Sequence, residues 1–72
     1  MNKLYRRNNN GVPTVWWAEL DNGTNSITVF YGLVRGNIRK KVYAVTQKDG
    51  QKELESRYND KIKQGYTYLN EL

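Results

Sequence analysis

The chain has 72 residues and a net charge of +5, and it contains neither Cys nor His. A chain of this length forms one small domain. Without Cys and His it has no disulfide, no thiolate nucleophile and no zinc finger, and it lacks the commonest general base near neutral pH. We therefore expect a domain that is not an enzyme and that uses no metal and no cofactor.

The excess of basic residues predicts an acidic partner, usually nucleic acid or an anionic surface. The longest apolar run is far shorter than the ~20 residues that a membrane span requires. Met1, Asn2 and Lys3 lead directly into a mixed polar stretch, so we expect no signal peptide. These features predict a single cytoplasmic domain over residues 1–72 that does not contact a membrane.

Turn-forming clusters divide the first two thirds of the chain into short segments in which apolar and polar residues alternate. The clusters are rich in Asn and Gly, which tolerate the backbone conformations of tight turns, and they lie at 8–11, 21–25 and 36–37. The segments predicted as strands are 3–7, 14–20, 26–34 and 38–45. Because short connections join them, we expect an antiparallel meander.

Alternation along a strand also predicts which face each side chain occupies. Trp16 and Trp17 are adjacent, so one belongs to the core and the other points to the opposite face or lies under a loop. In the fourth segment Lys40 lies on the opposite face from Arg39 and Lys41.

From Thr46 onward the apolar period is helical. One stripe recurs every four residues and consists of Leu54, Tyr58 and Ile62. Thr46 followed by Asp49 resembles a capping box, and Gly65 is a typical helix stop. The tail at 66–69 is expected to fold back as a short extended piece. A helix with one apolar stripe covers one face of a sheet, so the predicted fold class is α+β, with about four antiparallel strands and one C-terminal helix.

Charge is distributed unevenly along the chain. Between Asn22 and Lys48 there are basic residues and no acid, whereas most acids lie in the helical region. If the helix covers one face of the sheet, we expect the other face and its loops to carry concentrated positive potential, which attracts phosphates. The alternative is a solvated strand whose Lys residues prevent aggregation at the sheet edge.

The nine aromatic residues are more than a small core can bury. Exposed rings beside Arg and Lys can stack on bases, which favours nucleic-acid binding. Alternatively, both faces of the sheet are partly covered, or a protein partner or second copy buries the surplus rings.

The order of four sequence pieces resembles the WGR domain, named after a Trp-Gly-Arg motif in poly(ADP-ribose) polymerases. The pieces are an opening Leu-Tyr-Arg-Arg at 4–7, a Trp-bearing strand at 15–17, Phe-Tyr-Gly-Leu-Val-Arg-Gly at 30–36, and a helix ending in Lys-Gln-Gly-Tyr at 63–66. The match covers nearly the whole chain. Related versions occur at the front of some phage ATP-dependent DNA ligases and in stand-alone bacterial proteins, and this chain is most similar to the ligase-associated branch.

The resemblance implies a small sheet packed on a helix. It implies binding to DNA near strand breaks or ends, and therefore a role in DNA repair. It also implies the cytoplasm of a bacterial or phage-infected cell. At the motif, Tyr31 stands in the position of the Trp and Leu33 in the position of the Arg. Tyr31 can still stack on a sugar or base, whereas Leu33 cannot contact phosphate, and Arg35 lies two residues further along the strand.

We therefore expect a non-catalytic DNA-binding module, alone or within a nucleic-acid-processing enzyme. The residues expected to contact nucleic acid are Tyr31, Arg35, Arg39, Lys40, Lys41, Lys61 and Lys63. The alternative function is a protein-interaction or self-association module that uses exposed aromatic residues.

Overall fold

The structure, a computed structural model, describes residues 3–69 of the chain. Met1 and Asn2, on which the absence of a signal peptide was predicted, lie outside the described residues, as do the last three positions of the predicted domain. The elements are β1 (Leu4–Arg7), β2 (Pro13–Asp21), β3 (Ser26–Leu33), β4 (Ile38–Ala44), α1 (Gly50–Lys63) and β5 (Thr67–Tyr68). Within the described residues, no helix is long and apolar enough to cross a membrane.

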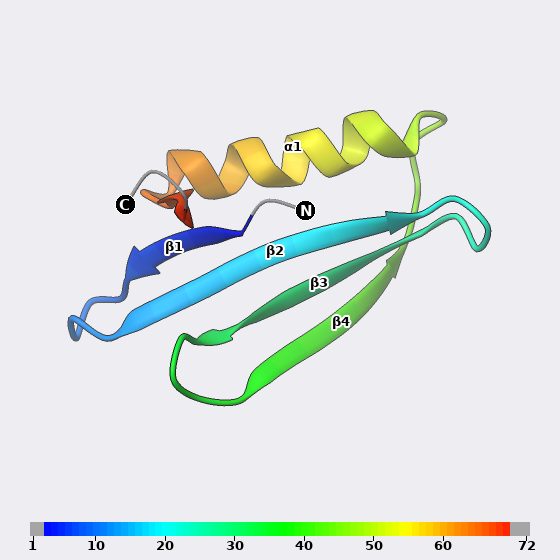
Figure 1. The fold of residues 1–72 in the computed structure, drawn as a ribbon. Helices are drawn as coiled ribbons and strands as arrows, with labels where there is room; N and C mark the ends of the chain where they lie inside the picture. The colour runs from blue at the N-terminus through cyan, green and yellow to red at the C-terminus, as the bar shows by residue number, and fades with distance from the viewer. Residues whose placement is uncertain (1–2, 70–72) are drawn as a thin grey trace.

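The strands form one antiparallel sheet in the order β4-β3-β2-β1-β5, with α1 lying across one face (Figure 1). The α+β prediction is therefore confirmed, with four meander strands and one C-terminal helix. The tail after the helix returns as β5, where Tyr68 pairs with Leu4 of β1. Adjacent strands are joined by short turns, as the Asn- and Gly-rich clusters predicted.

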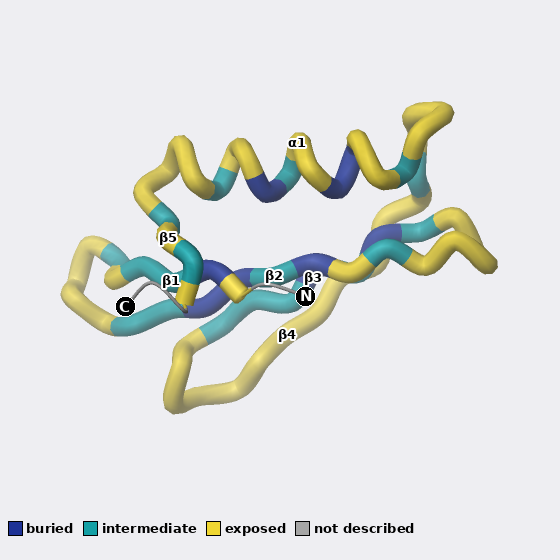
Figure 2. The backbone as a smooth tube through the Cα atoms, turned by 45° about the horizontal axis from the view of Figure 1, so that its top comes forward, coloured by how far each residue is buried: buried dark blue, intermediate teal, exposed yellow. Residues whose placement is uncertain are grey.

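The core lies between α1 and the middle of the sheet. Trp16 is only 4% exposed, and its ring packs edge-on against the ring of Tyr58, with centroids 5.0 Å apart. Alternation places Trp17 on the opposite face, which α1 does not cover. Figure 2 shows buried backbone beneath α1 and along the central strands, whereas β4 is exposed throughout. The buried cluster consists of Leu4, Trp16, Ala18, Ile27, Val29, Leu54 and Tyr58.

The helix begins with a cap that differs from the predicted one. Asp49 is itself the N-cap, since its carboxylate accepts from the backbone N–H groups of Gln51 and Lys52. Thr46 does not form a capping box with Asp49. Instead, the backbone N–H and hydroxyl of Thr46 both donate to Glu53, at 3.0 and 2.9 Å. The capping-box prediction is therefore wrong, because the loop before α1 is held by a helical side chain.

The C-terminal end of α1 follows the predicted glycine stop. Gly65 has φ +97°, its N–H donates to the carbonyl of Ile62, and the N–H of Tyr66 donates to the carbonyl of Lys61. This pair of bonds is the Schellman arrangement that terminates many helices. Arg6 of β1 also donates to the carbonyl of Gln64, which fixes the helix end over the sheet.

Candidate nucleic-acid interface

A groove follows the side of α1 that faces β4. The helix packs mainly on β2 and β3, so β4 extends beyond it as the outer strand of the sheet (Figure 1). Two cavities lie along this side, and another, lined by residues of the strands and by Tyr66, lies just beyond the last turn of α1. We call the three together the α1 groove. Their volumes, from the C-terminal to the N-terminal end of α1, are about 480, 230 and 560 Å³.

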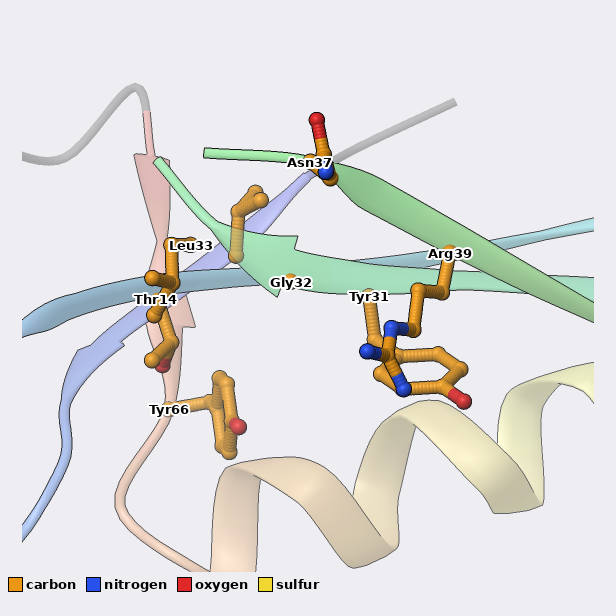
Figure 3. Close-up of a pocket in the computed structure, with 8 residues that line it drawn as sticks. Thr14, Tyr31, Gly32, Leu33, Asn37, Arg39 and Tyr66 are labelled. Atoms are coloured by element: carbon orange, nitrogen blue, oxygen red, sulfur yellow. The ribbon is translucent and has the colours of Figure 1, made fainter. Parts of the chain in front are cut away.

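The first cavity combines aromatic rings with a cation. Tyr31 and Arg39 are register partners on β3 and β4, and both side chains extend toward the helix side of the sheet (Figure 3). Tyr66, which follows α1, contributes a second ring to the lining. Thr14 and Asn37 also belong to the lining. Two rings, a guanidinium and polar side chains thus line one open cavity.

The second and third cavities share Tyr43, Arg57 and Asp60 in their linings, so they are adjacent. The guanidinium of Arg57 lies over the ring of Tyr43, 4.4 Å from its centroid, which links α1 to β4. This distance is within the range of a favourable cation–π contact.

Lys61 connects the second cavity with the first. Its Nζ lies 5.7 Å from the ring centroid of Trp16 and 5.6 Å from that of Tyr66. Because Trp16 lines the second cavity and Tyr66 lines the first, this ammonium group stands between the two.

The residues predicted to contact nucleic acid occupy different parts of the surface. Tyr31 and Arg39 line the first cavity and Lys61 lines the second. Lys41 pairs with Val29, a core residue, and so faces the helix side of β4. The other three are exposed but line none of these cavities: Arg35 is in the β3–β4 turn, Lys40 is on the opposite face of β4, and Lys63 is in the last turn of α1.

The cations were expected on the sheet face away from the helix, and for Arg39 and Lys41 of β4 this is wrong. Pairing of Tyr31 with Arg39 and of Val29 with Lys41 places both cations on the helix side, whereas Lys40 faces the other way. Alternation along a strand divides three consecutive basic residues between the two faces. Positive charge therefore borders the α1 groove as well as the open face.

Among the groove residues that were not predicted are two with aromatic rings and one with a guanidinium: Tyr43, Tyr66 and Arg57. The sequence carried a signal for Arg57, because it lies three residues after Leu54 and therefore beside the apolar stripe of the helix. No pattern signalled Tyr43, since its position in the groove depends on how far β4 extends beyond α1.

Acidic groups near the groove differ in their roles. Glu53 is only 6% exposed, and its Oε1 accepts from both donors of Thr46 and from the N–H of Gln47. The backbone and side-chain hydrogen bonds from Thr46, then the bond from Gln47 and the charge of Arg57, lower the pKa of Glu53 despite its burial. Glu53 is thus engaged in holding the loop. Asp60, in contrast, is exposed and lines the second and third cavities.

The open face of the sheet presents a different arrangement. Trp17 and Phe30 are register partners whose rings stack with centroids 4.7 Å apart and planes inclined by 10°. Lys3 Nζ lies 4.6 Å from the centroid of the Trp17 ring. Val42, on the same face by alternation, is 64% exposed. No described element covers this face.

No family model matches the chain, and comparisons with curated proteins and with solved structures give no match either. Within residues 3–69, no cluster of three or more acidic side chains is placed to hold a metal ion.

Proposed function

We propose that this domain binds nucleic acid, DNA in the first place, through the α1 groove. The observation that carries the proposal is the first cavity, where Tyr31, Tyr66 and Arg39 line one open hollow. Aromatic rings stack on unpaired bases or sugars, and a guanidinium pairs with phosphate oxygens. On this proposal the domain binds nucleic acid without catalysing a reaction. It acts in the cytoplasm of a bacterial or phage-infected cell.

The resemblance to the WGR domain supports the same site. Tyr31 stands at the position of the motif Trp, and its ring lines the first cavity. Leu33, at the position of the motif Arg, is 45% exposed and lines the same cavity without a charge. We propose that Arg39, the register partner of Tyr31, supplies the cation there, and that strand ends or nicks are the contacted form of DNA.

The proposal is tested by titrating labelled duplex, nicked and single-stranded DNA with the protein at two salt concentrations. Arg39→Gln and Lys40→Gln each remove one positive charge from neighbouring positions of β4, but on opposite faces. We expect binding at low salt that weakens as salt rises, with a larger loss for Arg39→Gln than for Lys40→Gln. Absence of binding at low salt, or equal losses in the two variants, contradicts the proposal.

A second candidate function is docking of a protein partner or a second copy through the open face. The stacked pair of Trp17 and Phe30, with exposed Val42 and Ile38 beside it, favours this candidate. Sedimentation across a range of concentrations tests it for self-association. We expect a wild-type dimer that Trp17→Ser abolishes, and a monomer at all concentrations argues against self-association.

A further inference from the structure

We propose that the DNA strand contacted at an end or nick is unpaired where it lies in the α1 groove, runs along α1 and makes a second contact at Tyr43 and Arg57. This inference rests on the proposed nucleic-acid function and goes beyond it in naming the form of the ligand and a second contact site. The first contact is the cavity of Tyr31 and Arg39. The second lies beside the middle of the helix, where Arg57 lines the second and third cavities.

The groove is long enough for two contacts. Helix α1 has 14 residues, which corresponds to ~21 Å at 1.5 Å per residue. The first cavity lies by Tyr66, after the last turn of α1, and the third lies by Glu53, in the first turn. Lys61 lies between the first cavity and Arg57, so cations occur at the C-terminal end of the groove and along its middle.

The chemistry of the second contact favours unpaired bases. The guanidinium of Arg57 lies on the ring of Tyr43, which makes a layered surface of cation and ring. Bases stack on guanidinium planes as well as on aromatic rings, provided that they are not already stacked inside a duplex. The Nε of Arg57 is buried without a hydrogen-bond partner in the described part of the chain. This nitrogen therefore does not bind the guanidinium to another described group of the protein by a hydrogen bond.

Asp60 lies close to where the strand would pass. Its carboxylate lines both the second and the third cavity, where it repels a phosphate backbone. Glu55, on the same helix, is exposed and lines none of the described cavities. Removing the charge of Asp60 should therefore strengthen binding more than removing the charge of Glu55.

The experiment measures the affinity of fluorescent oligothymidines, one of two nucleotides and one of about ten, for the wild type and for matched variants. Arg57→Gln removes both the positive charge and the planar guanidinium group on which a base would stack. Arg57→Lys keeps the charge but not the planar group. The control, Lys52→Gln, removes an exposed cation of α1 that lies outside the groove. Circular dichroism checks that each variant is folded. For the long strand we expect about fivefold weaker binding in Arg57→Lys, which loses the stacking plane, and a larger loss at low salt in Arg57→Gln, which loses the charge as well.

The salt dependence separates charge from stacking. In Arg57→Gln the slope of log K against log salt should fall in magnitude by about 0.7, the loss of one phosphate contact on a single strand, whereas Arg57→Lys should keep the wild-type slope. The dinucleotide, which occupies one cavity, should lose less affinity than the long strand in these variants. Asp60→Asn should tighten binding of the long strand about twofold more than Glu55→Gln.

The outcomes distinguish this inference from the proposed function. If the long strand binds and responds to Arg39→Gln but Arg57→Gln behaves as Lys52→Gln, the second contact is wrong and the nucleic-acid function stands. If duplex binds more tightly than the long single strand, the single-strand assignment is wrong. If neither oligonucleotide binds at low salt and duplex does not bind either, the proposed function itself fails.

Discussion

At the scale of single residues, Gly32 shows how closely β3 and β4 approach each other beside the first cavity. A Cβ at this position would lie 2.4 Å from the backbone carbonyl oxygen of Asn37. This contact is with backbone, which cannot move aside as the end of a flexible side chain does. Glycine at this position therefore allows the β3–β4 hairpin to bring Tyr31 and Arg39 into register.

The closeness of β3 and β4 at Gly32 predicts that an added side chain there lowers stability. Gly32→Ala should lower the free energy of unfolding by about 3 kcal/mol, because the added methyl group forces the two backbones apart. Gly23→Ala, in the β2–β3 turn, is the control, since its Cβ would meet only the side chain of Asp21 at 3.2 Å. Urea unfolding measures both, and a loss for Gly32→Ala no larger than for Gly23→Ala contradicts the account.

The carboxylate of Glu53 gives a prediction for pH. Donation from Thr46 and Gln47 and the charge of Arg57 lower the pKa of Glu53 below its ordinary value of 4.5. A group with a lowered pKa in the folded state stabilises the fold fully above its unfolded pKa, and this contribution is lost as pH falls through the folded pKa. Stability should therefore decrease with acid below about pH 4.5.

Two variants assign this pH dependence to Glu53. Glu53→Gln should lower stability at neutral pH and flatten the acid limb of a plot of unfolding midpoint against pH. Thr46→Val, which removes the hydroxyl donor to Glu53, should flatten this acid limb to a smaller extent. Acid limbs identical to that of the wild type in both variants would show that Glu53 does not carry the effect.

At the scale of elements, Tyr58 joins α1 to the sheet by more than packing. Its hydroxyl accepts from the N–H of Ala18 at 3.0 Å and donates to the carbonyl of the same residue at 3.1 Å. Ala18 is fully buried, so its backbone groups have no access to water. One hydroxyl thus satisfies two polar groups of β2, and burial raises the pKa of Tyr58 although its bond to Ala18 opposes the rise.

Tyr58→Phe should therefore cost about 2 kcal/mol of stability, because the ring still packs against Trp16 while two buried backbone groups lose a partner. Tyr66→Phe is the control, since Tyr66 is half-buried outside the core cluster, and it should cost less than about 0.5 kcal/mol. Thermal or urea unfolding measures both. Equal costs would mean that the Tyr58 hydroxyl does not contribute to holding α1.

Helices and strands were predictable where a short-range sequence pattern determines the structure. Alternation along β2 separated Trp16 from Trp17, although it left open which of the two is buried. The four-residue period placed Leu54 and Tyr58 on the buried side of α1, whereas Ile62, of the same stripe, is 40% exposed. The helix cap was mispredicted because Thr46 is bound by Glu53, a residue seven positions away, and no short-range pattern encodes that bond. The stop at Gly65 was predictable since the glycine conformation is local.

At the scale of the whole molecule, the candidate site depends on the position of the helix relative to the sheet. Pairing of Tyr31 with Arg39 requires the register of β3 and β4, and the contact of Arg57 with Tyr43 requires α1 to leave β4 uncovered. Neither follows from composition or periodicity. The sequence therefore yielded several of the groove's residues, such as Tyr31, Arg39 and Lys61, but not the groove that assembles them.

We propose that nucleic acid occupies the α1 groove and not the open face of the sheet. Chemical-shift mapping by NMR, during titration of the labelled protein with a single-stranded oligothymidine at low salt, tests it most directly. We predict perturbed signals at Tyr31, Arg39, Arg57, Lys61 and Tyr66, with the indole N–H of Trp17 little affected. Perturbation centred on Trp17 and Phe30, or none at any position, would contradict the claim.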